Sequence, residues 1–281
     1  MKQLYDVPAP AKLNLFLHIT GQRPDGYHLL QSAFMLIDWC DTLHFEKRPN
    51  GAISREDLTV QLPAEDLITR AAKLLQQHTG CTQGAHIAVE KHIPAQAGMG
   101  GGSSDAASCL LALNQLWSLN LSLETLEKLG LQLGADVPFF LRGQNAWVEG
   151  IGEQITPISL PKAYFWVIKP PSGIETAQIF KHPDLQRATK PATISVFAAQ
   201  PYDFGHNDLQ PIAEAICPEV LQARQVLSNA GMSGKMTGSG SAVFAHCTTG
   251  TTLSPVPDHW QVRKCSNLEV HPLKGWASSD S

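Results

Sequence analysis

Residues 94–105 read Pro94-Ala95-Gln96-Ala97-Gly98-Met99-Gly100-Gly101-Gly102-Ser103-Ser104-Asp105, and this stretch decides the fold. It joins a predicted strand at 85–89, where polar and apolar residues alternate, to a predicted helix at 106–116. Glycine adopts the left-handed backbone without steric penalty, so consecutive N–H groups can point inward as a nest for an anion. The start of the helix, expected near Ser103, adds unpaired N–H groups and the positive end of its dipole. The stretch therefore predicts a phosphate cradle.

The two serines at the end of this loop leave several roles open. Ser103 and Ser104 can cap the helix, ligate a cation beside a phosphate, or do both. A flexible glycine turn is the alternative for the whole loop, but it gives no reason for a Ser-Ser helix start. Three familiar templates do not fit: a Walker A loop needs Lys where Ser103 stands, a dinucleotide fingerprint spaces its glycines differently, and a protein-kinase loop lies between two strands.

The first half of the chain predicts a mixed α and β domain. Period-two alternation predicts a half-buried strand over 11–19, and a second strand is expected over 33–45. Apolar residues on one helical face predict a helix over 66–79, closed by Gly80. After the glycine loop, a further helix is expected over 122–134, with Ser122 as its N-cap.

The composition of the sequence changes beyond Gly152. Prolines punctuate the chain, and residues 186–202 are typical of a connecting region. A second α/β domain is therefore expected, with its boundary between Gly152 and Pro161. Its predicted elements are strands at 164–168 and 241–246 and helices at 212–216 and 219–230.

Composition bounds the function without naming it. The 281 residues are 43% hydrophobic and 16% charged, with a formal net charge of −4 and an isoelectric point near 6.2. These values exclude a disordered chain, collagen and a disulfide knot. They also argue against a dedicated nucleic-acid binder, because such proteins usually present a basic face. We expect no nucleic-acid partner.

The location is expected to be cytoplasmic. The six cysteines are scattered without a C-x-x-C pair, which is typical of reduced, structural thiols. No apolar segment suited to a signal peptide follows Met1. The uncharged stretch 106–123 holds Ser, Asn and Gln, so it is a poor membrane span and a good buried helix. No membrane partner is expected.

Three motifs in this chain resemble those of the GHMP small-molecule kinases, the family of galactokinase, homoserine kinase and mevalonate kinase. The glycine loop at 94–105 is similar to the family's ATP-phosphate motif. The N-terminal and C-terminal motifs of the family are matched by Pro10-Ala11-Lys12-Leu13-Asn14-Leu15 and by Lys235-Met236-Thr237-Gly238-Ser239-Gly240-Ser241-Ala242. The three occur in the family's order and spread across most of the chain.

The resemblance implies an α+β fold of two domains. The N-terminal ATP-binding domain, expected over 1–155, would be a ribosomal-S5-like α/β domain. The C-terminal domain, expected over 156–274, would be ferredoxin-like. The small polar tail at 275–281 is expected to be disordered.

The resemblance also implies ATP as co-substrate, with Mg²⁺, and a small-molecule acceptor. Two further stretches, 23–28 (Arg-Pro-Asp-Gly-Tyr-His) and 133–140 (Leu-Gly-Ala-Asp-Val-Pro-Phe-Phe), are similar to the branch of the family whose acceptor is a cytidyl diphosphate erythritol. The start motifs typical of galactokinase and mevalonate kinase are absent from the sequence. The ATP-binding residues implied are Pro94, Gly98, Met99, Gly100, Gly101, Gly102, Ser103 and Ser104.

Two residues are expected to carry the chemistry. Asp136 stands before Pro138, where an Asp is often an N-cap, and the resemblance implies a catalytic base; the two roles are compatible. Lys12 lies inside an apolar strand, where a lone ammonium is unfavourable unless paired. Beside Asp136 it would stabilise the carboxylate and a developing alkoxide. The alternative for Lys12 is a strand-edge position that points to water.

A base-binding site is implied on the acceptor side. Tyr27 and His28 follow a turn and could be ordinary surface aromatics. The resemblance implies that Tyr27 and Phe180 stack on cytosine while His28 binds its edge; stacking contributes roughly 1–3 kcal/mol per base. The other implied substrate contacts are Asn14, Thr176, Thr237, Gly238, Ser239 and Gly240, with a plain turn as the alternative for 237–240.

Two departures from the family pattern concern the nucleotide. Asp66 stands where the family usually has Asn, which leaves the adenine contacts open. Asp105 replaces a frequent Asn after the two serines, and it could bind Mg²⁺ through water or cap the helix. Ser103 and Asp105 are the candidate metal ligands.

Two other functions compete with this one. Another kinase of the same family would keep the glycine loop but would not need the pair Tyr27 and Phe180. A catalytically silent nucleotide-binding module would tolerate the loss of Lys12 and Asp136, and both are present.

Overall fold

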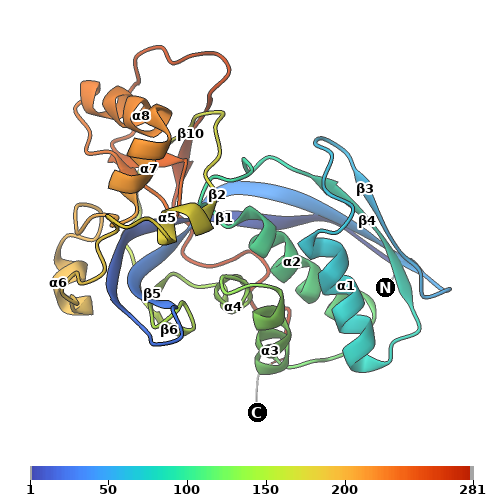
Figure 1. The fold of residues 1–281 in the computed structure, drawn as a ribbon. Helices are drawn as coiled ribbons and strands as arrows, with labels where there is room; N and C mark the ends of the chain where they lie inside the picture. Colours follow the sequence, from blue (N-terminus) through green and yellow to red (C-terminus); the bar gives the residue numbers. More distant parts are fainter. Residues whose placement is uncertain (1, 279–281) are drawn as a thin grey trace.

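Two long antiparallel strands, β1 (Gln3–Gln22) and β2 (His28–Arg48), organise the first domain (Figure 1). The chain is described from a computed structural model that covers residues 2–278. β1 extends well beyond the predicted strand at 11–19, and its register with β2 shifts at several points, which lets the pair bend. Pro8 and Pro10 lie on β1, where a missing N–H donor is tolerated because a strand at the edge of a sheet leaves that side unpaired.

The first sheet is six-stranded, with the order β3-β4-β2-β5-β6 and β1 paired to β2. The pairings are antiparallel except for β3 with β4, which is parallel. The remaining strands are β3 (Ile53–Asp57), β4 (Gly84–Glu90), β5 (Ala146–Glu149) and β6 (Gln154–Pro157).

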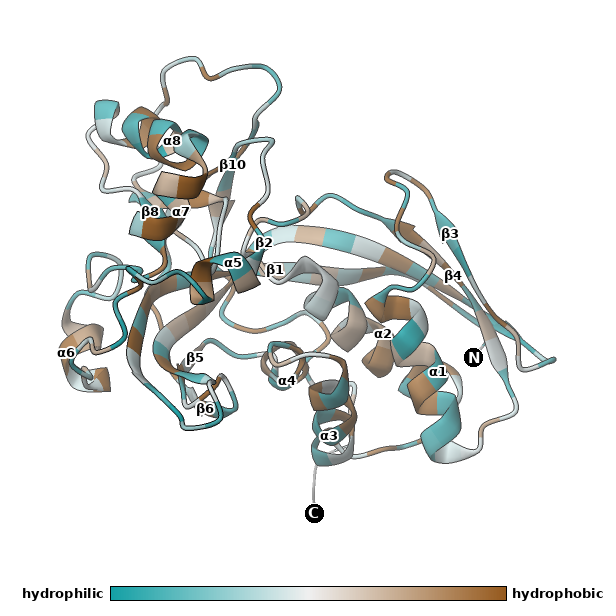
Figure 2. Cartoon of the chain, in the orientation of Figure 1, coloured by the Kyte–Doolittle hydropathy of each residue, from teal (hydrophilic) through white to brown (hydrophobic). Residues whose placement is uncertain are grey.

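Helices cover one face of this sheet: α1 (Leu67–Thr79), α2 (Gly101–Leu116), α3 (Leu123–Leu133) and α4 (Val137–Arg142). The predicted helix at 66–79 is confirmed, since the Asp66 side chain caps it and Gly80 ends it at a φ of 65°. Ser122 caps α3 as predicted. α1 turns its hydrophobic side toward α2 and its hydrophilic side outward (Figure 2).

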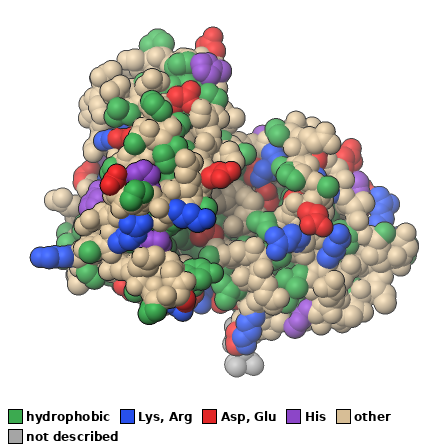
Figure 3. All heavy atoms as spheres, in the orientation of Figure 1, with side chains coloured by type: hydrophobic (Ala, Val, Ile, Leu, Met, Phe, Trp, Pro, Cys, Tyr) green, Lys and Arg blue, Asp and Glu red, His purple; other side chains and the backbone are tan. Residues whose placement is uncertain are grey.

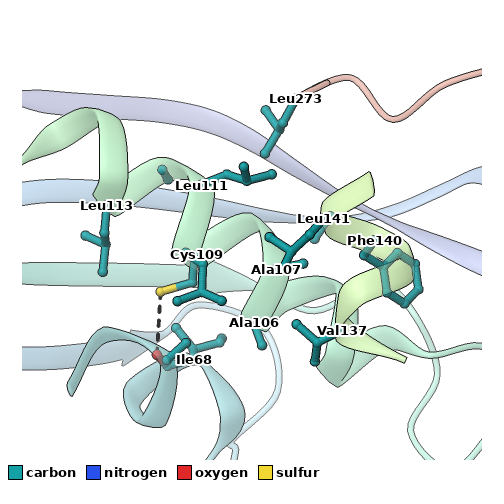
Figure 4. Close-up of a cluster of buried hydrophobic side chains, with 14 of the residues drawn as sticks. Ile68, Ala106, Ala107, Cys109, Leu111, Leu113, Val137, Phe140, Leu141 and Leu273 are labelled. Carbon is teal, nitrogen blue, oxygen red and sulfur yellow. Dashed lines mark hydrogen bonds between the residues drawn. The ribbon is translucent and has the colours of Figure 1, made fainter. Parts of the chain in front are cut away.

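The core of the first domain lies between these helices and the sheet (Figure 4). α2 is buried along nearly all of its length, which explains why its sequence carries no charge after Asp105. The Cys109 thiol donates to the Ile68 carbonyl oxygen at 3.5 Å, so it bonds across the contact of α2 with α1. The thiols of the described residues are all free, as the scattered cysteines predicted.

The second domain is built on a four-stranded antiparallel sheet of order β10-β7-β9-β8. Its strands are β7 (Tyr164–Lys169), β8 (Lys235–Met236), β9 (Val243–Cys247) and β10 (Gln261–Ser266). Its helices are α5 (Thr176–Phe180), α6 (Ile194–Ala199), α7 (Gln210–Ile216) and α8 (Pro218–Asn229). No helix within residues 2–278 is long and apolar enough to cross a membrane.

Several expectations about boundaries differ from the structure. The expected division at 155/156 falls inside β6, which pairs with β5 of the first sheet. The connecting region at 186–202 contains α6, capped by Thr193. α2 begins at Gly101, ahead of the predicted start near Ser103. Strand pairing and tertiary packing set these limits, and neither leaves a local signal in the sequence.

The C-terminal segment returns to the first domain. Leu268 N donates to the Leu36 carbonyl oxygen at 2.8 Å, and Leu273 is buried in the first core. Residues 275–278 of the tail expected to be disordered are described and docked, because Trp276 packs on that core and Ser278 bridges to Ser122. Residues 279–281 lie outside the described residues.

Candidate active site

The glycine loop forms one side of a cavity of about 690 Å³, which we call the loop cavity. Residues 94–103 line it from the first domain, and residues 174–177 and 239–240 line it from the second. The space-filling view shows the surface hollowed between the two parts of the molecule (Figure 3). Gly98 and Gly100 have φ values of 70° and 72°, the left-handed backbone that the sequence predicted for an anion nest.

The two glycine motifs pack against each other. The Thr237 hydroxyl donates to the Gly98 carbonyl oxygen at 3.2 Å, and Ser241 N donates to the Gln96 carbonyl oxygen at 3.1 Å. A Cβ at Gly98 would collide with the Thr237 carbonyl oxygen. Residues 237–240 form the turn between β8 and β9, so the plain-turn alternative describes their shape, and Ser239 and Gly240 also line the loop cavity.

Ser103 and Ser104, at the start of α2, have different surroundings. Gly100 occupies the N-cap of α2, and no side chain caps the helix there, so the capping alternative is wrong for both serines. The buried Ser104 hydroxyl donates to the Pro10 carbonyl oxygen at 2.7 Å, which ties α2 to β1, and Ser104 does not line the loop cavity. Ser103 lines the cavity.

Lys12 and Asp136 meet beside the loop. Lys12 N donates to the Met99 carbonyl oxygen at 3.0 Å, and a Cβ at Gly100 would lie 3.3 Å from Lys12 Cε. Lys12 Nζ lies 3.8 Å from Asp136 Oδ2 and also bonds to Asn14 Oδ1. The Lys12 side chain is 5% exposed and that of Asp136 33%, so the strand-edge alternative for Lys12 is wrong.

The charges of this pair follow from its surroundings. Burial lowers the pKa of the Lys12 ammonium, and the nearby Asp136 carboxylate opposes the shift. Asp136 stands at the N-cap position of α4 but makes no side-chain cap bond. Its carboxylate is one-third exposed to solvent and lies next to the Lys12 ammonium, which favours its ionised form.

Asn14 and Thr237 link the site across the two domains. Asn14 N donates to the Thr237 hydroxyl at 2.9 Å, and Asn14 Nδ2 donates to the Ser32 hydroxyl at 2.9 Å. Both residues are buried. Asn207, on the second domain, donates to the Gly238 carbonyl oxygen at 2.8 Å and supports the same turn.

A second cavity of about 400 Å³, the aromatic pocket, contains Tyr27, His28 and Phe180. The ring centroids of His28 and Phe180 lie 5.0 Å apart, while Tyr27 is 61% exposed. α5 connects the two cavities, since Thr176 at its start lines the loop cavity and Phe180 at its end lines the aromatic pocket. The hydroxyls of Thr176 and Ser239 lie 2.7 Å apart.

A buried cluster of three charges underlies the loop. Lys91 Nζ pairs with both Asp41 and Asp105, and Asp41 Oδ1 accepts from His92 N and Ile93 N at 2.5 and 2.7 Å. Burial raises the pKa of Asp105 to about 7, with Lys91 acting against the shift. Asp105 does not cap α2; its Oδ2 pairs with Lys91, and the residue lines the loop cavity.

Asp66 also has a structural task. Its Oδ1 accepts from Ile68 N at 2.6 Å, and its Oδ2 pairs with Arg55. Asp66, Leu67 and Ile68 all line the loop cavity, so the start of α1 faces this cavity.

Sequence reasoning missed Lys91, Asp41 and Arg187. Arg187 Nε donates to His28 Nε2 at 3.1 Å and so belongs to the aromatic pocket. Arg187 lies in the region taken for a connector, and no spacing in the sequence relates it to His28. In the sequence, only the position of Lys91, three residues before Pro94, points to the charge cluster.

Comparison with known proteins assigns the family. Residues 66–144 match the model of the GHMP kinases N terminal domain, and residues 196–261 match that of the GHMP kinases C terminal domain. The chain belongs to the GHMP kinase family. The first match contains the glycine loop and Asp136, and the second contains the turn at 237–240. The chain is thus a small-molecule kinase, and ATP is the co-substrate that this family implies.

The relatives place the chain within a branch of the family. It is 63% identical to the 4-diphosphocytidyl-2-C-methyl-D-erythritol kinase of Acidovorax sp. (strain JS42), covering 98% of this chain and 99% of that protein. It is 62% identical to the enzyme of the same name from Paracidovorax citrulli (strain AAC00-1), over the full length of both. The chain belongs to this branch.

Solved structures agree with the assignment. A crystal structure of 4-(cytidine 5'-diphospho)-2C-methyl-D-erythritol kinase, 30% identical, matches 94% of this chain and 98% of its own with a TM-score of 0.76. A homoserine kinase from Cytophaga hutchinsonii, 14% identical, matches with a TM-score of 0.70 and shares the fold. The predicted two-domain α+β fold is confirmed.

Proposed function

We propose that this kinase transfers the γ-phosphoryl group of ATP to the 2-hydroxyl of 4-diphosphocytidyl-2-C-methyl-D-erythritol. The products would be the 2-phosphate and ADP, the kinase step of the non-mevalonate isoprenoid pathway. The observation that carries the proposal is the Lys12–Asp136 pair beside the glycine loop. We also propose a cytoplasmic location, in keeping with the free thiols of residues 2–278.

Asp136 acts as the base in this proposal. Its carboxylate takes the proton of the acceptor hydroxyl, the oxygen attacks the γ-phosphorus, and the bond to the β–γ bridging oxygen breaks as ADP leaves. The Lys12 ammonium stabilises the carboxylate before transfer and the negative charge that develops on the acceptor oxygen. Asn14, which bonds to Lys12 Nζ, holds the ammonium in place next to Asp136.

The loop cavity would hold ATP. The backbone of Gly98 to Gly102 and the start of α2 offer N–H groups and a positive dipole end to the phosphates. Residues 66–68 and Pro94 would line the nucleoside end. Ser104 supports the loop by its bond to Pro10.

The loop cavity is suited to Mg²⁺ that is held mainly by water and phosphate oxygens, with few ligands from the protein. Magnesium keeps several waters and is usually held by one or two protein oxygens together with substrate phosphates. Ser103 lines the cavity and its hydroxyl would be such a ligand, whereas Asp105 is paired with Lys91. When bound, the ion would neutralise phosphate charge during transfer.

The aromatic pocket would hold the cytosine. Tyr27, with its exposed ring, can close over a base that lies against Phe180, while His28 binds the edge of the base. Thr176, Ser239 and Gly240 lie on the path along α5 from this pocket to the loop cavity. The acceptor would then reach from the pocket toward Asp136.

The domain division belongs to the same proposal. The ATP-binding domain of residues 1–155 would end within β6, and the domain of residues 156–274 would supply the turn at 237–240 and α5.

An ADP-release assay tests the function. The purified protein is given ATP and, separately, the cytidyl diphosphate methylerythritol, mevalonate and homoserine. The cytidyl acceptor should support turnover and the other two should not. Turnover on mevalonate or homoserine alone would favour another kinase of the family, and ATP binding without turnover on any acceptor would indicate a silent nucleotide-binding module.

A further inference from the structure

Arg187 contacts both walls of the aromatic pocket. Its Nε donates to His28 Nε2 at 3.1 Å, and its Nη2 donates to the Phe180 carbonyl oxygen at 3.2 Å. The rest of its guanidinium is bound to the same loop, because Nη2 also donates to the His182 carbonyl oxygen at 2.8 Å and Nη1 to that of Leu185 at 3.0 Å. One side chain therefore joins the loop after α5 to the start of β2, 159 residues away.

We propose that Arg187 is a positioning residue of the base pocket: it holds the Phe180 wall against His28 and fixes the His28 ring as the tautomer with its hydrogen on Nδ1. This inference rests on the proposed function for its consequence in catalysis, but the tautomer itself does not depend on the substrate.

The tautomer follows from the donors and acceptors. A guanidinium has donors and no acceptor, so the His28 Nε2 that faces Arg187 Nε must carry a lone pair. A neutral imidazole has one N–H, which therefore resides on Nδ1. The ring then offers one donor, suited to an acceptor atom on a base. Without Arg187 the ring would be free to exchange its hydrogen between the two nitrogens.

The same contact makes the pocket sensitive to acid. A protonated His28 would bear hydrogen on both nitrogens and would face the Arg187 guanidinium with a donor against a donor. Burial and the Arg187 charge together lower the pKa of His28, which keeps the ring neutral. The other titratable groups at the pocket are Tyr27 and Asp25, and the Asp25 carboxylate pairs with Arg23 at 2.6 Å. Loss of Arg187 removes one cause of the lowering, so His28 should become protonated at a higher pH.

Kinetics of Arg187→Gln and Arg187→Lys test the positioning role. We expect KM for the cytidyl acceptor to rise about 5- to 30-fold, as expected for lost bonds to a charged group, with kcat and KM for ATP little changed. The acid limb of kcat/KM for the acceptor should move to higher pH in Arg187→Gln. Arg224→Gln is the matched control, because Arg224 also anchors a backbone carbonyl, that of Gly234, but on α8 away from the pocket.

Nitrogen-15 spectra of the imidazole test the tautomer without any turnover. Long-range proton–nitrogen correlations of His28 in the wild-type protein near neutral pH should show an acceptor-type Nε2 and a protonated Nδ1. In Arg187→Gln the two nitrogens should move toward averaged shifts. A wild-type Nε2 that carries the hydrogen would overturn the inference.

The two proposals fail in different ways. If the wild type does not phosphorylate the cytidyl acceptor, the proposed function fails and the spectra still decide the tautomer. If the wild type is active and Arg187→Gln changes kcat and both KM values equally, or behaves as Arg224→Gln does, the positioning role is wrong.

Discussion

The loop cavity and the aromatic pocket lie at the two ends of α5, and they are built from different materials. One wall of the loop cavity is main chain: left-handed glycines, the start of α2 and a turn that packs on them through backbone hydrogen bonds. The aromatic pocket is shaped by side chains from three separate segments, around Tyr27, Ile151 and Phe180.

The difference follows from what each site would bind. A phosphate is met by N–H groups that any sequence possesses, provided the backbone can take the required shape, so glycine is the essential residue. A base needs flat apolar surfaces and a few directed hydrogen bonds, so side-chain identity matters. The two sites should therefore respond differently to substitution.

The largest effect is expected at the pair between the two sites. Asp136→Asn should lower kcat by about 10²–10⁴, because the amide cannot take the proton of the acceptor. Single-turnover phosphoryl transfer measures this directly. Asp6→Asn changes an exposed carboxylate that is 88% accessible and should leave kcat unchanged. Turnover near wild type in Asp136→Asn would reduce Asp136 to a structural residue at the start of α4.

The next effect concerns the backbone character of the loop cavity. Gly98→Ala should lower kcat/KM for ATP by about 10-fold or more, an effect of roughly 1–3 kcal/mol from strain at a left-handed position and a forced shift of the loop. Gly80→Ala is the control, because Gly80 has a φ of 65° but nothing within 4 Å of an added Cβ. Equal losses of Tm in both variants, with unchanged ATP kinetics, would contradict the close packing of the two glycine motifs.

Tyr27→Ala tests the side-chain character of the aromatic pocket. KM for the cytidyl acceptor should rise about 5- to 150-fold, the equivalent of a stacking contribution of roughly 1–3 kcal/mol, while KM for ATP stays near wild type. Tyr5→Ala removes a comparably exposed ring, 50% accessible, far along β1. Equal effects on the two KM values would remove Tyr27 from the base site.

The smallest effect is expected in the charge cluster under the loop. Two buried carboxylates share the single ammonium of Lys91, so Asp105→Asn should raise the free energy of unfolding at pH 8 by about 1 kcal/mol. Asp41→Asn should lower it, because the single amide oxygen cannot accept from the two backbone N–H groups and also face the Lys91 ammonium. Denaturant unfolding measures the free energy of unfolding of both variants against the wild type. A clear loss of stability in Asp105→Asn would show that Lys91 needs both partners.

Prediction from the sequence succeeded where the signal was local. The helix predicted over 66–79 was evident from its periodicity and its terminal Gly80, and the structure adds Asp66 as its cap. The length of β1 was not, because Pro8 and Pro10 break the alternation that marks a strand, and pairing with β2 overrides that break. α6 was missed for a similar reason, since Phe197 is the one residue of that short helix that is buried.

The same contrast holds for the candidate site. The glycine loop, Lys12, Asp136, Tyr27 and His28 were all named from motifs, and the structure places them at the two cavities or beside the loop. The sequence does not show that Ser104 bonds to the Pro10 carbonyl oxygen or that Asp105 pairs with Lys91. Whether these residues have the proposed roles stays a prediction for the variants above.

The sequence by itself determined the shape of the phosphate loop and the capped helices, because backbone preference and capping act over a few neighbouring residues. Its three motifs were enough to indicate the kinase family. The sequence already led us to expect Lys12 beside Asp136, but only the tertiary structure decided that Lys91 meets both Asp41 and Asp105 and that Arg187 meets His28. Contacts between segments so far apart depend on how the sheets and helices pack around them. No local pattern of residues encodes that packing.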